Sequence, residues 1–210
     1  MFMGLAADER RALSDLFDEL GPDVPTLCEG WQSKDLAAHL ALRDRRPDAA
    51  AGIQVKALSG YTERVQRGYA DKPWAQLIEL VRTGPPALSP FRLPGLSELV
   101  NGTEFFVHHE DLRRGQPDWE PRVPDPARDA ALWKTLRMAS KLAFRRSPVG
   151  IVLRRTDGEE ITVKRGPNTV TIVGEPGELL LNAAGRSAVR VSFNGDQAAI
   201  GIVQGLDRAL

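Results

Sequence analysis

Apolar side chains recur at helical spacing through the first two-thirds of the chain. Between Glu9 and Leu20 they fall at Leu13, Leu16 and Phe17, and Gly21 follows as a stop signal. Further helices are predicted over Lys34 to Arg46, Gly60 to Ala70, Trp74 to Arg82, Leu96 to Arg114 and Pro126 to Arg146.

Polar and proline positions give the expected ends of these helices. Ser33 is expected to cap the second helix and Pro47 to end it, and Ser59 is expected to cap the third. The run Gly84 to Pro94 is rich in proline, so it is expected to be a crossover loop between bundle helices.

The pattern changes after Pro148. Val149 to Arg155 alternates weakly and is rich in branched residues, and Asp157-Gly158 is a hairpin signal before a return strand at Ile161 to Lys164. A strand at Thr169 to Val173, a helix at Pro176 to Ala184, a strand at Ala188 to Phe193 and a short terminal helix follow. The patterns predict an α+β protein, with a helical bundle over residues 1–147 and a small α/β domain over 148–210.

Composition narrows the classes of function. Of the 210 residues, 42% are hydrophobic, which is enough for a real core, and the formal net charge is zero. A nucleic-acid binder is not expected, because phosphate binding requires a basic face. No run approaches the roughly 18 apolar residues of a membrane span. Cys28 is the single cysteine, so no internal disulfide is possible, and a cytoplasmic protein is expected.

Three ionisable residues occupy helix positions that are usually apolar or small. His39 borders the inward face of its helix beside Leu36 and Leu40, and Glu104 and His108 stand four residues apart. That spacing stacks Glu104 and His108 on one helix face, where both can reach one cation. Two histidines and one carboxylate leave an open position on a divalent ion, which is the pattern of a catalytic site.

Plainer interpretations of the same residues stay open. Glu104 and His108 can form an ordinary ion pair across one helical turn, and a histidine such as His39 is more often a hydrogen-bonded core residue. The neighbouring His109 and Glu110 point to other helix faces and are expected at the surface.

Two aspartates stand at helical spacing from the histidines. Asp35 precedes His39 by four residues and Asp111 follows His108 by three. Either aspartate can accept a hydrogen bond from the ring nitrogen that does not bind a metal, and so fix the imidazole tautomer. Either can also be a solvated charge, which is the favoured interpretation for both. Cys28 precedes Glu29, whose charge disfavours a thiolate, so Cys28 is interpreted as a small buried residue and not as a nucleophile.

Two separated motifs resemble those of a known family. The first motif consists of Thr26 to Trp31 (TLCEGW) and Lys34 to Leu40 (KDLAAHL), and the second is Glu104 to Asp111 (EFFVHHED). Both are similar to motifs in the N-terminal domain of the mycothiol-dependent maleylpyruvate isomerase family. The resemblance implies a DinB-like four-helix bundle. It also implies a divalent metal ion, typically zinc, held by His39, Glu104 and His108.

The C-terminal part is more weakly similar to the same family. The helix that ends at Gly185-Arg186 resembles one whose arginine contributes to the isomerase active site, so Arg186 is a candidate catalytic residue. Its alternative role is that of a cation at a helix C-terminus. The chain looks closest to an uncharacterised actinobacterial branch of the family, so the substrate does not transfer with the fold.

The candidate metal site predicts a metal-dependent enzyme, and the resemblance implies that it uses a small thiol, mycothiol, to conjugate or isomerise an electrophile. The expected activity is that of an isomerase or an S-transferase. A non-catalytic metal- or small-molecule-binding protein and a metallohydrolase remain alternatives. A metalloprotease is not expected, because the chain has no His-Glu-x-x-His motif. A monomer and a homodimer are equally compatible with the sequence, and no residues are assigned to thiol binding.

Overall fold

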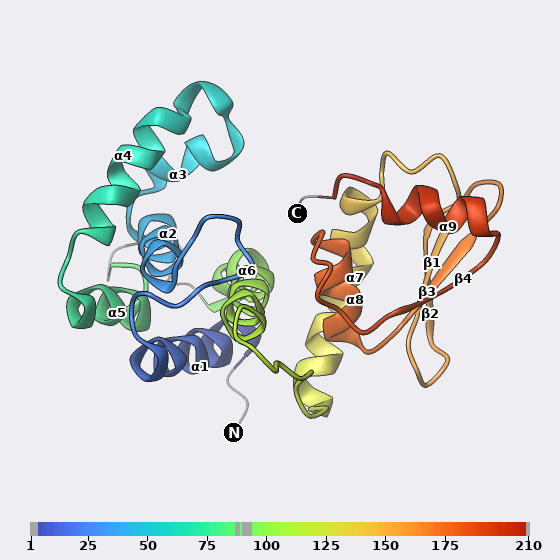
Figure 1. The fold of residues 1–210 in the computed structure, drawn as a ribbon, viewed down its shortest axis with the longest axis horizontal. Coiled ribbons are helices and arrows are strands. Elements are labelled where there is room, and N and C mark those ends of the chain that lie inside the picture. Colours follow the sequence, from blue (N-terminus) through green and yellow to red (C-terminus); the bar gives the residue numbers. More distant parts are fainter. Residues whose placement is uncertain (1–3, 87–88, 90–93, 209–210) are drawn as a thin grey trace. The chain divides into compact units, whose positions relative to one another are not determined.

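The computed structural model describes residues 4–86, 89 and 94–208. The chain divides into two compact units, Met1–Trp119 and Glu120–Leu210 (Figure 1). The expected crossover loop at Gly84 to Pro94 lies partly outside the described residues. Among the described helices, none is both long and apolar enough to cross a membrane.

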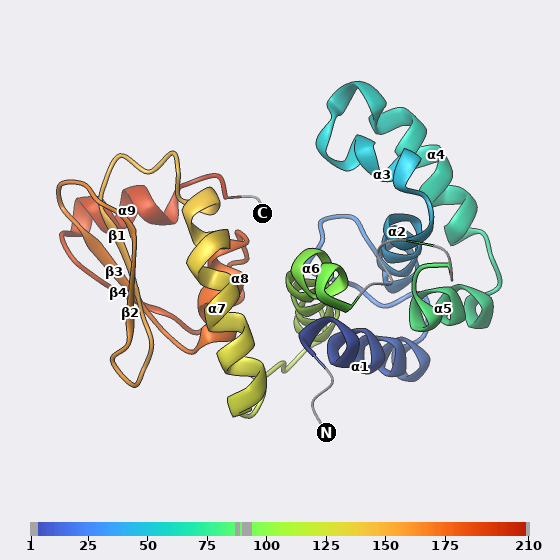
Figure 2. The same cartoon turned by 180° about the vertical axis from the view of Figure 1, so that it is seen from behind.

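The first unit is helical. Its α-helices are α1 (Leu5–Leu20), α2 (Ser33–Arg45), α3 (Pro47–Gln54), α4 (Ser59–Ala70), α5 (Trp74–Thr83) and α6 (Pro94–Arg114). A short 3₁₀ turn at Lys56–Leu58 lies between α3 and α4. Helix α1 packs on α5 and α6, and α2 packs on α4 and α5 (Figures 1 and 2).

One hydrophobic core joins α1, α2, α5 and α6 as a four-helix bundle. The predicted apolar stripe of α1 supplies Leu13 and Phe17, which are both fully buried. Helix α6 supplies Phe105, next to Glu104, and Leu112, four residues after His108, to the same core. The remaining core side chains come from α2 and α5, namely Leu36, Ala37, Ala38, Leu40, Ala41, Leu77, Ile78 and Val81.

Two expected helix caps in the bundle were wrong. Ser33 begins α2 instead of capping it: Gln32 is the cap residue, and Asp35 Oδ2 accepts a hydrogen bond from Gln32 N at 3.0 Å. Ser59 likewise begins α4 instead of capping it. Pro47 ends α2 as predicted but also begins α3, which the sequence analysis missed. Proline is favoured in the first turn of a helix, so one residue serves both helices.

The second unit holds a four-stranded sheet in the order β2-β1-β3-β4, with β1 at Ile151–Arg154, β2 at Glu160–Lys164, β3 at Val170–Val173 and β4 at Ser192–Asn194. Strands β1 and β2 form the predicted hairpin, in which Leu153 faces Ile161. Strand β3 runs parallel to β1 and antiparallel to β4. The helices are α7 (Pro126–Ala143), α8 (Pro176–Ala183) and α9 (Gln197–Gln204). The last predicted strand is much shorter than expected, since only Ser192–Asn194 pairs with β3.

Helix α7 packs within the second unit, against α8 and β2. Its buried face includes Leu132, Trp133 and Leu136. The sequence pattern instead predicted that this helix belongs to the bundle, with a boundary after residue 147. The difference arises because an apolar stripe shows that a helix is covered but does not show what covers it. With α7, the unit Glu120–Leu210 has helices and a sheet around its own core, and the α+β class is confirmed.

Candidate metal centre

His39 lies inside the first unit, on α2. The residue is 6% exposed, and the neighbouring Leu36 and Leu40 anchor this part of the helix in the core. The ring of Trp31 lies 5.2 Å from the ring of His39, centroid to centroid. His39 Nε2 points to Glu104 Oε1 on α6, at 3.1 Å. The core packing of α2 therefore aims this imidazole across to α6.

Glu104 and His108 stand one turn apart on α6, as the sequence spacing predicts. Glu104 Oε1 lies 3.0 Å from His108 Nε2. The rings of His39 and His108 lie 5.2 Å apart and meet edge to face. The structure thus brings together the three residues that the sequence analysis named, each with one potential ligand atom within 4.8 Å of the other two.

The spacing of these atoms fits a divalent ion. Two ligands at about 2.1 Å from a tetrahedral ion lie roughly 3.4 Å apart. The 3.0 Å and 3.1 Å separations at Glu104 Oε1 are close to that distance. Two nitrogen donors and one carboxylate oxygen also form the donor set that zinc and similar ions accept. Small side-chain shifts would therefore allow the three residues to hold such an ion.

The environment sets the charge of each group in the absence of a metal. Burial lowers the pKa of His39 below its usual value, against the opposing effect of Glu104. Burial alone would raise the pKa of Glu104, but hydrogen bonds from His108 and His39 bring it well below its usual value. Burial likewise opposes a charged His108, yet its hydrogen bonds to Asp111, Cys28 and Glu104 raise its pKa well above the usual value. These surroundings therefore favour the ionised form of Glu104, and they favour a protonated ring more at His108 than at His39.

Arg43 is a residue of this site that the sequence analysis missed. It follows His39 by one turn on α2, and its Nη1 lies 2.5 Å from Glu104 Oε1. The side chains of Arg43 and Glu104 are 22% and 27% exposed, against 8% for His39 and 11% for His108. The site therefore meets solvent at the Arg43–Glu104 edge. The spacing of Arg43 from His39 is the signal that points to it.

Asp111 and Cys28 lie behind His108, and both expectations for them need correction. Asp111 is fully buried and not solvated, and its Oδ2 lies 2.9 Å from His108 Nδ1. Cys28 is only partly buried, and its Sγ lies 3.3 Å from Asp111 Oδ2 and 3.9 Å from His108 Nδ1. Cys28 is therefore part of the surroundings of the site and not a plain core residue.

His109 and Glu110 were expected at the surface, but both are buried. His109 Nδ1 lies 2.7 Å from Glu9 Oε2 on α1, and Glu110 accepts hydrogen bonds from Arg113 and Arg114. Each buried side chain thus has a hydrogen-bonded partner, which is how a helix buries polar residues on more than one face. Glu110 finds its partners on α6 itself, whereas the partner of His109 lies on α1, which sequence spacing alone cannot show.

The other two candidates have different surroundings. Asp35 makes the capping contact with Gln32, so it serves the start of α2. Arg186 follows α8 in the second unit, where its Nη1 donates to Ala184 O at 2.8 Å. This bond at the end of a helix matches the alternative role stated for Arg186, and its catalytic role stays a prediction.

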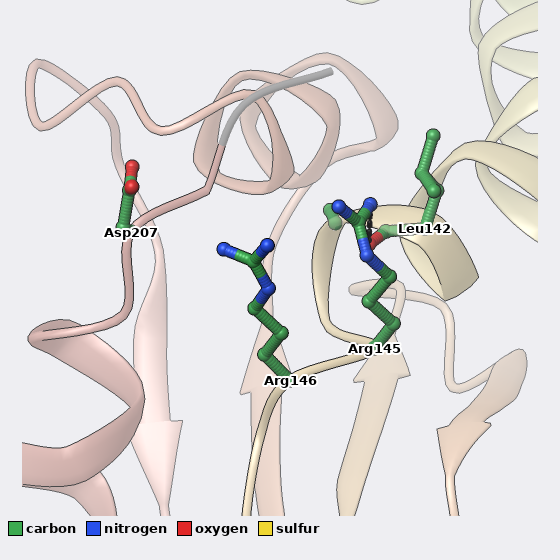
Figure 3. Close-up of a pocket in the computed structure, with 5 residues that line it drawn as sticks. Leu142, Arg145, Arg146 and Asp207 are labelled. Atoms are coloured by element: carbon green, nitrogen blue, oxygen red, sulfur yellow. Dashed lines mark hydrogen bonds between the residues drawn. The ribbon is translucent and has the colours of Figure 1, made fainter.

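The second unit also carries a hollow lined by Leu142, Ala143, Arg145, Arg146 and Asp207 (Figure 3). The side chain of Arg146 extends between Arg145 and Asp207 (Figure 3). The lining contains no histidine or cysteine, so its donor set does not suit the metal ion proposed for the bundle.

Two solved structures that are similar to this chain are both of one enzyme. Over 90% of both chains, the protein is similar to a crystal structure of mycothiol-dependent maleylpyruvate isomerase, with a TM-score of 0.63 and 17% identity. A histidine-to-alanine mutant of that isomerase matches over the same share, with a TM-score of 0.61 and 16% identity. The chain has the fold of this isomerase. The predicted helical bundle followed by a small α/β domain is thereby confirmed as a fold.

Comparisons of sequence give no further assignment. No family model matches the chain, and no curated protein matches it. The likeness to mycothiol-dependent maleylpyruvate isomerase therefore establishes the fold, while the reaction depends on the residues of the site.

Proposed function

We propose that His39, Glu104 and His108 hold a divalent metal ion, zinc in the first instance, and that the chain is a thiol-dependent enzyme acting on a small electrophile. The observation that carries the proposal is the convergence of these three side chains from α2 and α6 at a site with one solvent-facing edge. A structural zinc site is usually closed by four protein ligands. Three ligands with an open edge favour a site that receives a small molecule.

Each residue of the site has a separate role in this proposal. Neutral His39 and His108 offer ring nitrogens, and Glu104 offers a carboxylate oxygen. A divalent ion held there supplies a Lewis-acid position at which a thiol loses its proton near neutral pH. The buried rings exclude water from one side of the site, so a ligand enters past Glu104 and Arg43.

Arg43 suggests that the incoming molecules are anionic. A divalent ion and Arg43 together bring more positive charge than Glu104 and Asp111 can balance, so an anionic ligand restores neutrality. A carboxylate on the electrophile would find a bidentate partner in the guanidinium of Arg43. Arg186 remains a second candidate for the same role, by resemblance.

The chemistry that fits this site is thiol addition to an electrophilic carbon. In conjugation, a carbon–sulfur bond forms and the thiol proton ends on the substrate. In isomerisation, the thiol adds, a bond rotates and the thiol leaves unchanged, so the thiol acts as a catalyst. The solved neighbours are mycothiol-dependent isomerases, so mycothiol is the first thiol to test. The proposed location is the cytoplasm, where thiols stay reduced.

Metal content is the first test. Protein purified without a nickel column should carry about one ion per chain, and His39→Ala, Glu104→Ala and His108→Ala should each lose it. His109→Ala is the matched control, because His109 is an equally buried neighbour that faces Glu9 instead of the site. Unchanged metal content in all three site variants would refute the metal site.

Thiol dependence is the second test. The metal-loaded protein should turn over a member of a panel of carboxylated electrophiles only when mycothiol is present. Turnover of ester substrates with water and no thiol would instead favour a hydrolase. If the protein binds one metal ion per chain but turns over no substrate, that result would favour the remaining alternative, a non-catalytic binding protein.

A further inference from the structure

The buried carboxylate of Asp111 is the acceptor for two groups at the back of the metal centre. Its Oδ2 lies 2.9 Å from His108 Nδ1 and 3.3 Å from Cys28 Sγ, and the residue is 0% exposed. Burying a carboxylate without hydrogen-bond donors is costly. A ring N–H from His108 and an S–H from Cys28 provide such donors.

The contact with Asp111 selects one ring nitrogen of His108. A neutral imidazole carries a single N–H, and the other nitrogen presents its lone pair. With the N–H on Nδ1 facing Asp111, Nε2 is the nitrogen left to bind an ion. When the metal-free ring carries both protons, Nε2–H donates to Glu104 Oε1 at 3.0 Å. Histidines that bind metals commonly have their other ring nitrogen fixed in this way.

A second group of donors overlaps the first. Cys28, His108 and Asp111 also place one potential ligand atom each within 4.8 Å of one another, and this group would use Nδ1 of His108. A neutral ring cannot offer both nitrogens, so Cys28 and Asp111 either orient His108 or hold the ion themselves. Asp111 has no exposed surface, whereas Glu104 is 27% exposed. An ion and its small-molecule ligand can therefore enter beside Glu104, which favours the orienting role.

Backbone contacts hold Cys28 in place beside Asp111. Leu27 N donates to Asp111 O at 2.9 Å, and Cys28 N donates to Thr26 Oγ1 at 3.1 Å. Thr26 Oγ1 donates in turn to Trp31 O at 3.0 Å. The loop between α1 and α2 is thus tied both to itself and to the last turns of α6. The same loop places Trp31 against His39, so it contacts both histidines of the site.

We propose that Asp111 and Cys28 are positioning residues for His108: Asp111 accepts a hydrogen bond from the Nδ1–H and so leaves Nε2 to bind the metal, and Cys28 holds Asp111 by donating its thiol hydrogen. The inference assigns a role to the cysteine of the TLCEGW stretch, which the proposed function does not use. It rests on the proposed metal site, but its first test is independent of any metal.

The first test is the tautomer of His108, read from its ring nitrogen resonances by NMR. The chain has three histidines, so assignment by single substitution is practical. In metal-free Glu104→Ala protein, where no carboxylate competes for Nε2, His108 should carry its proton on Nδ1 at a pH where the ring is neutral. When Asp111→Ala is added to this variant, the two tautomers should become mixed. A proton on Nε2 in Glu104→Ala would overturn the proposal even if the metal site is correct.

The second test is zinc affinity, measured by competition with a chelator. Asp111→Asn and Asp111→Ala should bind zinc about 10- to 100-fold more weakly, as expected for loss of a carboxylate behind a histidine ligand. Cys28→Ala should cost at most about fivefold, the net value of one ordinary hydrogen bond, and Cys28→Ser should restore the affinity because a hydroxyl also donates. Equal affinities in Cys28→Ala and Cys28→Ser would overturn the role of the thiol.

Two controls separate positioning from general destabilisation and from direct ligation. Glu110→Gln changes a buried carboxylate that adjoins Asp111 and pairs with Arg113 and Arg114, so it should lower stability but keep zinc affinity. Cobalt-loaded protein should lack a thiolate charge-transfer band if Cys28 does not bind the ion. Such a band, lost in Cys28→Ser, would show that Cys28 is a ligand and would overturn the positioning role.

Discussion

Arg43 Nη1 and Glu104 Oε1 lie 2.5 Å apart, so the proposed carboxylate ligand has a cation beside it before any metal arrives. The guanidinium of Arg43 competes with a metal ion for Glu104 Oε1, and its positive charge repels the ion. A cation placed next to a metal ligand weakens metal binding and strengthens the binding of an anionic partner.

Arg43→Met should therefore separate the two effects. We expect zinc affinity to rise about tenfold, because a charge that opposes the ion is removed. The KM for a carboxylated substrate should rise at the same time. Arg43→Lys is the control that retains the charge without the planar fork, and it should stay near the parent in zinc affinity. Weaker zinc binding in Arg43→Met would show that Arg43 supports Glu104 and does not compete for it.

Zinc binding should release about one proton per ion at neutral pH. The pKa of His108 is raised well above its usual value in the metal-free protein, so its ring gives up a proton when it becomes a ligand. The pKa values of His39 and Glu104 are lowered, so neither contributes a proton. Zinc affinity should thus increase as the pH rises towards the His108 pKa. Calorimetry in buffers of different ionisation enthalpy measures the release directly, and no release at neutral pH would contradict this assignment.

Gly115 should be needed for close contact between α6 and the loop that carries Cys28. A Cβ on this residue would lie 2.5 Å from Pro25 O and 2.7 Å from Thr26 Cα, both of which are backbone atoms. Gly115→Ala should destabilise the protein by about 1–3 kcal/mol, the usual cost of overpacking. Gly68→Ala is the control: a Cβ there meets nothing within 4 Å, and alanine favours a helix. Urea unfolding of both variants provides the comparison.

The second unit should fold only when α7 is present. A fragment of residues 120–210 retains the contacts of α7 with α8 and β2, whereas a fragment of residues 148–210 loses them. We expect cooperative thermal unfolding for the longer fragment and none for the shorter one, followed by circular dichroism. Cooperative unfolding of residues 148–210 would instead favour the boundary that the sequence pattern predicted.

The sequence predicted those features that depend on neighbours along the chain. The apolar stripe of α1, the Asp157-Gly158 hairpin and the one-turn spacing of Glu104 and His108 are all local patterns, and each is present in the structure. His39 was a candidate from its place on the inward helix face, and the resemblance to known motifs supported its grouping with Glu104 and His108, which no local pattern could establish.

Features that depend on contacts between distant segments could not be predicted. The spacing of Asp111 from His108 was visible in the sequence, but the burial of Asp111 and its contact with Cys28, 83 residues earlier, arise only in the folded chain. The burial of His109 likewise depends on Glu9, one hundred residues earlier in the sequence. The partners of α7 escaped prediction for the same reason.

The short stretch Thr26 to Trp31 contacts both histidines of the metal centre: Cys28 lies near His108, and the ring of Trp31 packs on that of His39. One added or deleted residue would shift both contacts in a single event, while a change of side chain at Leu27 or Glu29 would leave the backbone path intact. Natural variation in this loop should therefore be found in its composition far more often than in its length.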